Sequence, residues 1–144
     1  MKITVIKNIL SCVGAACLVV YFMHLIQSDF IFNFLKLNIT NLQVTLLAIN
    51  TATLSIVLTK IKEIIDKTGN KVAFEATRNE MLLSIKEQVV LVMASMFIIA
   101  ITEAKNFPFV IPMEVLQVCL IASFIYSIFI LYDTAKSVFI ILDF

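Results

Sequence analysis

Residues 42–59 read LQVTLLAINTATLSIVLT and carry no charged side chain, and this stretch decides the fold. An uncharged run of this length is long enough to cross the hydrocarbon core of a bilayer as a helix. A charged segment, residues 60–87, follows it, and a second apolar run, Gln88–Thr102, comes after that. The order apolar, charged, apolar predicts two membrane helices joined by a water-facing helical hairpin.

The composition of the whole chain points to the same environment. Hydrophobic residues make up 61% of the 144 residues, charged residues make up 15%, and the mean hydropathy is +1.04. Soluble domains are about 45–50% apolar and about 25% charged. The sequence therefore predicts an all-α integral membrane protein that forms a single domain over residues 1–144.

Four membrane spans are expected, at about residues 8–28, 42–60, 87–103 and 113–133, with a cytoplasmic hairpin at about residues 60–87. The first run is interpreted as a retained span, because no soluble domain follows that a cleaved signal would release. Asp29–Asn41 is predicted to be a turn, since phenylalanines beside sparse charges are typical of the membrane–water boundary. Gly69 and Asn70 are expected to form the turn of the hairpin, and Val138–Phe144 a tail on the membrane surface.

Positive charges are distributed unevenly over the two ends of these spans. Lys36 and Lys105 fall at one end, whereas the other lysines and the arginine fall at the opposite end. Because cytoplasmic loops carry an excess of lysine and arginine, both termini and the hairpin are expected in the cytoplasm.

The second span is unusually polar for a helix in lipid. Asn50, near its middle, needs a hydrogen-bond partner. A bond to another helix is favoured, and an amide that lines a pore or a ligand site is the alternative. Ala48, Ala52, Ser55 and Thr59 form a line of small residues, and such lines let membrane helices approach closely. We therefore predict a homo-oligomer packed through Asn50, Ala52 and Ser55.

Few residues are candidates for catalysis, proton transfer or metal binding. His24, the only histidine, lies near the end of the first span and is expected to be a neutral interfacial residue rather than a proton relay or metal ligand. Cys12, Cys17 and Cys119 lie inside apolar runs and are expected to be packing residues. The sequence has no glycine-rich phosphate loop, zinc-binding motif or serine-histidine-aspartate set, so no enzymatic activity, cofactor or metal is predicted.

The hairpin mixes apolar residues with both signs of charge, which suits a protein interface better than a nucleic-acid surface. Its apolar residues include Ile61, Ile64, Ile65, Phe74 and Met81. We predict that it docks a cytosolic partner protein through Lys67, Lys71 and Arg78, without direct binding to nucleic acid. The alternative is that the two arms of the hairpin only pack on each other.

The run Leu42–Ala52, LQVTLLAINTA, leads into a cytosolic helical hairpin within a small four-span protein. In these features the chain resembles KwaA, the membrane subunit of the bacterial Kiwa anti-phage defence system. The resemblance implies a sensor in the bacterial inner membrane that forms a homo-oligomer, a tetramer, and works with a cytosolic DNA-binding effector of the KwaB type. The competing interpretation is a small pore-forming channel or a holin-like membrane-permeabilising protein, which the polar second span supports.

Overall fold

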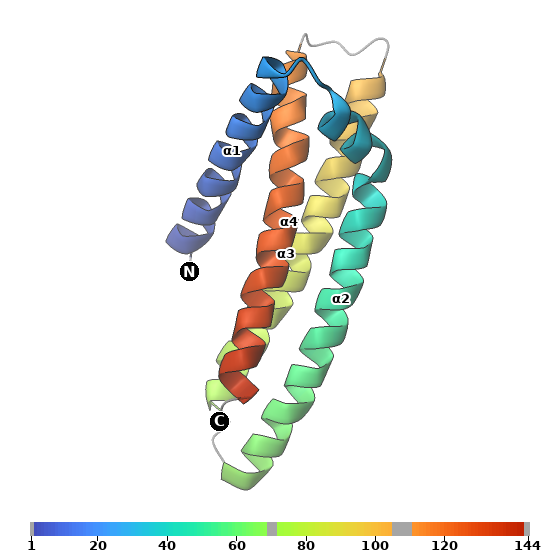
Figure 1. The fold of residues 1–144 in the computed structure, drawn as a ribbon. Helices are drawn as coiled ribbons and strands as arrows, with labels where there is room; N and C mark the ends of the chain where they lie inside the picture. Colours follow the sequence, from blue (N-terminus) through green and yellow to red (C-terminus); the bar gives the residue numbers. More distant parts are fainter. Residues whose placement is uncertain (1, 69–71, 105–110, 143–144) are drawn as a thin grey trace.

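The computed structural model describes residues 2–68, 72–104 and 111–142, and four helices form an antiparallel bundle over these residues (Figure 1). The helices are α1 (Lys2–Leu25), α2 (Phe30–Thr68), α3 (Val72–Glu103) and α4 (Met113–Leu142). Each contains a segment long and apolar enough to cross a membrane: Val5–Leu25, Phe30–Glu63, Arg78–Glu103 and Met113–Lys136. The prediction of an all-helical chain with four helices of membrane-spanning length is confirmed for the described residues.

The length of the helices follows from how rarely the chain is interrupted. It contains only two glycines and two prolines, and no proline lies inside a helix of the described residues. Gly69 directly follows the last residue of α2, and Pro112 directly precedes α4, where its carbonyl accepts a hydrogen bond from the Val115 amide at 3.1 Å. Helices commonly end before glycine, and proline is favoured where a helix begins.

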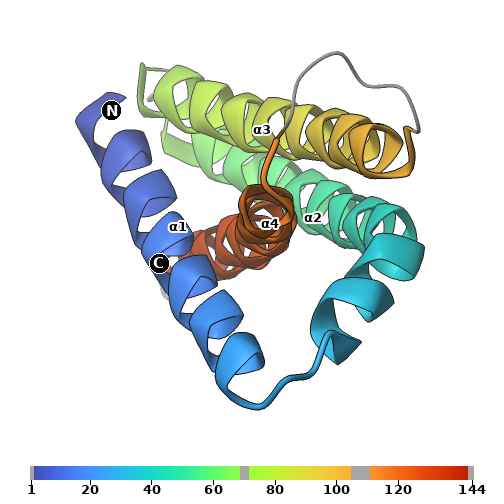
Figure 2. The same ribbon diagram turned by 90° about the horizontal axis from the view of Figure 1, so that it is seen from above.

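The prediction of a turn over Asp29–Asn41 is wrong, because α2 already begins at Phe30. The chain reverses over residues 26–29, where Gln27 adopts a positive φ of 50° and the Ser28 Oγ accepts a hydrogen bond from the Phe30 amide at 3.4 Å. Phe32, Leu35 and Ile39 recur at helical spacing and are buried, so these first turns of α2 pack as a helix. They run at an angle to the rest of α2 (Figure 2).

At the end of the bundle opposite Phe30, the helices extend beyond the predicted spans. α1 reaches back to Lys2, and α2 and α3 continue without a break into the predicted arms of the hairpin. α4 continues to Leu142, so the described part of the predicted surface tail is the last part of this helix. Val138 packs there against a buried cluster formed by Leu54, Val57 and Met81.

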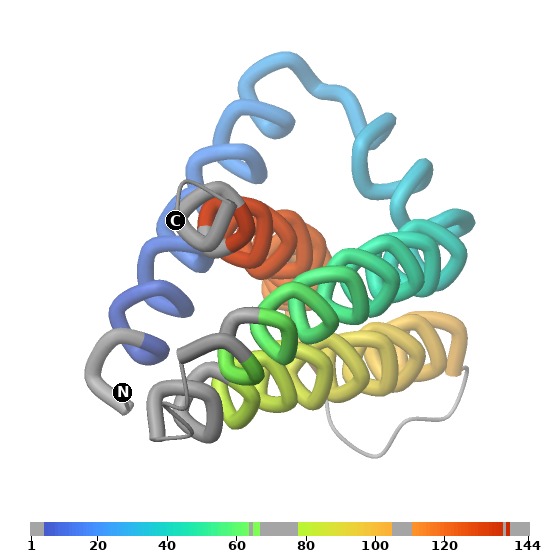
Figure 3. Tube along the Cα trace, turned by 90° about the horizontal axis from the view of Figure 1, so that it is seen from below, coloured from blue at the N-terminus to red at the C-terminus, as the bar shows by residue number. Residues whose placement is uncertain are grey.

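α4 is the central helix of the bundle. It packs against α1, α2 and α3, and α2 also packs against α3. Within the most apolar window of α4, 44% of the residues are buried, against 11% in the window of α1. Seen from below, α4 lies between α1 on one side and the pair α2 and α3 on the other (Figure 3). Ala16 and Met23 of α1 belong to the same buried cluster as Leu120 and Ile121 of α4.

Candidate functional site

Two layers of buried polar side chains join the helices. In the first layer, the Gln43 Nε2 donates hydrogen bonds to the Ser127 Oγ at 3.1 Å, the Ser123 Oγ at 3.3 Å and the Ser123 carbonyl oxygen at 3.4 Å. The Ser95 Oγ lies 2.7 Å from the Ser123 Oγ. Because the Ser123 hydroxyl donates to the Leu120 carbonyl, Ser95 is the donor in that pair. This layer connects α2 and α3 to α4.

The second layer is built around Asn50, which is 0% exposed. Its Nδ2 donates to the Gln88 Oε1 at 2.9 Å and to the Ser84 Oγ at 3.1 Å. The Ser84 Oγ lies 3.3 Å from the Thr134 Oγ1, and Thr134 donates in turn to the Ile130 carbonyl at 3.0 Å. The favoured interpretation of Asn50 as a partner in an interhelical hydrogen bond is confirmed.

The second layer leaves one donor and one acceptor without a partner among the described residues. These are the Gln88 Nε2 and the Asn50 Oδ1, and both side chains are buried. Reversing both amides exchanges the roles of the nitrogen and oxygen atoms but still leaves two amide atoms unsatisfied. An unpaired buried polar group costs about 1–3 kcal/mol, so this layer is a costly feature of the bundle.

The outward face of α2 carries the predicted line of small residues. Ala48, Ala52, Ser55 and Thr59 are all exposed on the single chain, on the side of α2 opposite Asn50. The Ser55 and Thr59 hydroxyls donate to carbonyls four residues back, at 2.9 and 3.0 Å, so neither requires an outside partner. Of the three residues predicted to pack an oligomer, Ala52 and Ser55 are free to do so, whereas Asn50 packs inside its own chain.

A cavity of about 450 Å³ lies between the helices next to the second polar layer. All four helices contribute to its walls, and Ser84 and Thr134 belong to both the layer and the cavity. Its acidic residues are Glu80, Glu87 and Asp133. The Tyr126 hydroxyl, in a side chain that is 8% exposed, donates to the Glu87 Oε2 at 3.0 Å and fixes that carboxylate against α4.

Two apolar residues of the hairpin take part in the core of the bundle. Met81 is buried in a cluster with Leu54 and Val57, and Ile61 and Val138 pack against that cluster. The alternative that the two arms of the hairpin only pack on each other stays a prediction. Of the predicted docking residues, Arg78 is exposed on α3 and Lys67 lies in the last turn of α2. Lys71 lies outside the described residues, and the docking role of all three stays a prediction.

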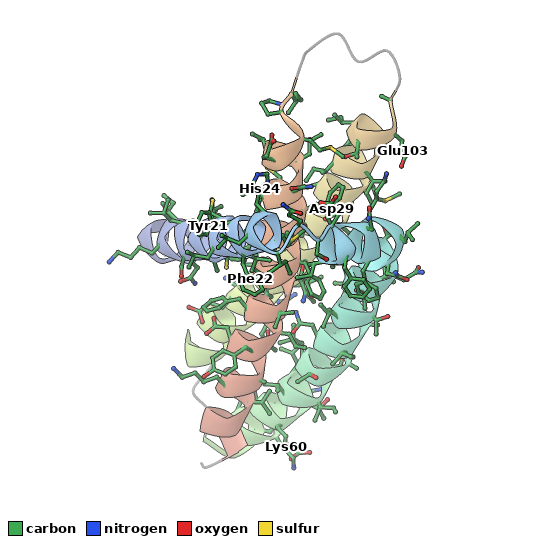
Figure 4. The ribbon with its side chains drawn as sticks, turned by 45° about the horizontal axis from the view of Figure 1, so that its top comes forward. Tyr21, Phe22, His24, Asp29, Lys60 and Glu103 are labelled. Atoms are coloured by element: carbon green, nitrogen blue, oxygen red, sulfur yellow. The ribbon has the colours of Figure 1, made fainter. Side chains whose placement is uncertain are left out.

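His24 and the cysteines occupy ordinary positions. His24 is exposed in the last turn of α1 (Figure 4). Cys12 is buried, Cys17 and Cys119 are exposed, and all three are free thiols. Within the described residues, no three His, Cys, Asp or Glu side chains lie close enough together to hold a metal ion.

Sequence reasoning did not identify the cavity or the partners of its polar residues. Gln88 and Glu87 were interpreted as the border of a span, yet one bonds to Asn50 and the other to Tyr126. The available signal was spacing, because Ser84 and Gln88 are four residues apart and therefore share a helix face with each other. The serines at 123 and 127 have the same spacing on α4.

Over residues 2–68, 72–104 and 111–142 the chain is helical, and its four helices are long and apolar enough to cross a membrane, which is typical of the class of helical membrane proteins. No protein-family model, curated protein or solved structure matches the chain.

Proposed function

We propose that this protein is a non-enzymatic, oligomeric scaffold or sensor of the bacterial inner membrane that regulates a cytosolic effector in anti-phage defence. The resemblance to KwaA supplies the defence context and the effector of the KwaB type. The observation that carries the proposal is the continuity of α2 and α3 with the arms of the hairpin.

Helix length decides how far these arms reach. At a rise of 1.5 Å per residue, the 39 residues of α2 span about 58 Å and the 32 residues of α3 about 48 Å. The hydrocarbon core of a bilayer is only about 30 Å thick. Part of the excess of α2 is the angled segment that begins at Phe30, and the rest of α2, with the start of α3, carries the charged residues of the hairpin. The bond between Asn50 and Gln88 joins the two helices next to these charged arms. A tilt of either span therefore moves the hairpin as a lever.

The orientation proposed for this lever is cytoplasmic. Lys60 lies at the opposite end of the bundle from Glu103 (Figure 4), and Lys60 belongs to the lysine-rich end. Lys36, at the sparsely charged end, forms an ion pair with Glu103, with its Nζ 2.5 Å from the Oε1. Reporter fusions after Lys36 and after Lys71 should report opposite sides of the membrane, with Lys71 in the cytoplasm. The same side for both fusions contradicts this topology.

Charge reversal on the hairpin tests the docking role. The triple variant Lys67→Glu, Lys71→Glu, Arg78→Glu should keep the wild-type fold and oligomer size, but lose co-purification with the proposed cytosolic effector and lose protection against phage. The matched control is Lys62→Glu, Lys86→Glu, Lys136→Glu, which makes the same change in net charge on exposed residues nearer the bundle. Retained binding and protection in a well-folded docking variant would exclude these three residues as the contact.

A small channel or holin-like protein is the second candidate function, and one observation favours it. The exposed side of α2 carries the hydroxyls of Thr45, Ser55 and Thr59, which would line a shared axis if several copies met there. Ion flux through the purified oligomer in liposomes separates the two functions. A conducting oligomer supports the channel, and a sealed oligomer supports the scaffold.

A further inference from the structure

The cavity between the four helices has the dimensions of a small-molecule site. Its volume of about 450 Å³ lies inside the range of about 300–1,000 Å³ that is typical of ligand pockets. Leu54, Met81 and Ile130 supply apolar walls from three different helices. The cavity is thus lined by apolar and polar side chains in nearly equal number.

The polar groups of the cavity favour a positively charged ligand over a negatively charged one. Glu80, Glu87 and Asp133 line it, and none of its described lining residues is lysine, arginine or histidine. Two aromatic side chains, Tyr126 and Phe129, also line it. Aromatic faces and carboxylates both attract a positive charge, and the attraction grows where water is partly excluded. An anion would meet only repulsion from these carboxylates.

The spacing of the acidic residues distinguishes between kinds of cation. Because no three acidic, cysteine or histidine side chains of the described part come close enough to hold a metal, the carboxylates are spread over the wall. A compact metal ion needs several ligands at short range, whereas a bulky cation with a diffuse charge does not. We propose that this cavity binds a small organic cation, an ammonium or phosphonium ion that carries an apolar body.

The positions of two glutamates on α3 indicate how such a ligand enters the cavity. Glu80 and Glu87 are seven residues apart, which places them on one side of α3 and about 10 Å apart along its axis. Glu80 is exposed at the hairpin end, whereas Glu87 is half-buried and held by Tyr126. The cation enters past Glu80 and rests between Glu87 and the aromatic rings. This site stands independently of the proposed scaffold function.

Binding of tetraphenylphosphonium to the purified full-length protein in dodecyl maltoside micelles tests the proposal by isothermal titration calorimetry. Tetraphenylborate has the same shape and the opposite charge, so it controls for partition into the apolar walls and the micelle. We expect saturable binding of the cation and none of the anion. Equal binding of both ions, or no saturable binding of the cation, overturns the proposal.

Two variants locate the bound ion, and a third serves as the control. Glu87→Gln keeps an acceptor for the Tyr126 hydroxyl but removes the charge, and should weaken cation binding about tenfold or more. Glu114→Gln makes the same change at an exposed position that does not line the cavity, and should leave the affinity unchanged. Leu83→Trp fills the cavity without changing charge and should also weaken binding. Wild-type affinity in a monodisperse Glu87→Gln protein would overturn the assignment on its own.

Discussion

Single polar residues decide how the helices of this bundle are matched to one another. The amide of Asn50 lies where α2 and α3 meet, and it reaches Gln88 and Ser84 of α3. In lipid, helices associate through close packing and through interhelical hydrogen bonds, and a buried amide favours the neighbouring helix that offers it a bond. The nearby Thr51 makes a useful contrast, because its hydroxyl bonds to the Leu47 carbonyl on its own helix at 2.8 Å.

Replacing Asn50 should therefore cost more stability than replacing Thr51. Asn50→Ala removes the donor to Gln88 and Ser84 and should lower the free energy of unfolding by about 1–2 kcal/mol. Thr51→Val should change it by less than about 0.5 kcal/mol. Unfolding in mixed micelles of dodecyl sulfate and dodecyl maltoside measures both.

Gln88, the hydrogen-bond partner of Asn50, provides a second test of the amide pair. The double variant Asn50→Leu, Gln88→Leu removes both amides, and with them both unsatisfied atoms, so it should be more stable than Asn50→Ala. Equal losses at positions 50 and 51 would show that the amide of Asn50 is not what joins α2 to α3. A double variant less stable than Asn50→Ala would contradict the cost assigned to the unpaired amide atoms.

At the scale of the element, the start of α2 is a helix that packs on the core, although its composition predicts a turn. The segment that begins at Phe30 has aromatics beside sparse charge, yet it is helical. The rings of Phe30 and Phe34 stack one helical turn apart, with centroids 6.3 Å apart, and the Asn38 side-chain amide donates to the Phe34 carbonyl at 2.9 Å. One side of this segment faces the core, and the other is exposed.

Two substitutions on this segment test its packing. Ile39 is 0% exposed and Leu37 is 80% exposed, although both are large aliphatic residues. Ile39→Ala should cost about 2–4 kcal/mol of unfolding free energy because it opens a cavity in the core. Leu37→Ala should cost less than about 0.5 kcal/mol. The same mixed-micelle unfolding measures both, and similar small costs at the two positions would support a loosely packed turn instead.

The sequence was sufficient to predict the number and type of helices, because charge-free runs and rare glycine and proline leave few alternatives in lipid. It was also sufficient to single out Asn50, since an amide at mid-span requires a partner. It could not give the identity of that partner, because Gln88 looks like the polar edge of a span until α2 and α3 are paired. The cavity could not be predicted from the sequence for the same reason, because Glu87 and Tyr126 come into contact only in the folded chain.

At the scale of the whole molecule, much of the apolar surface faces outward. α1 lies on the flank of the bundle, on the other side of α4 from α2 and α3 (Figure 3). Gly14 of α1 has no neighbouring atom within 4 Å of where a side chain would begin, so no other described part of the chain packs on it. Exposed apolar side chains are typical of a surface that faces lipid, and the small-residue line of α2 remains the face predicted to pack a second copy.

Bulk added to that face should disrupt self-association. Ala52 and Ser55 are exposed on the side of α2 opposite Asn50, and small side chains there permit close helix contact. The double variant Ala52→Leu, Ser55→Leu should shift a closed cyclic oligomer, a tetramer by the resemblance to KwaA, toward smaller species. An overpacked contact costs about 1–3 kcal/mol, and each 1.4 kcal/mol is about tenfold in association. Light scattering coupled to size-exclusion chromatography, in detergent and in nanodiscs, measures the mass.

The control for this variant adds bulk to a different exposed face. Val89 and Val90 are exposed on α3, and Val89→Leu with Val90→Leu should leave the oligomer mass unchanged. Because the Ser55 hydroxyl is already bonded to the Thr51 carbonyl, its loss removes no contact between helices, and any effect of the α2 variant comes from shape. An unchanged mass in the α2 variant would place the interface on another face, and a monomeric wild-type protein in nanodiscs would contradict self-association altogether.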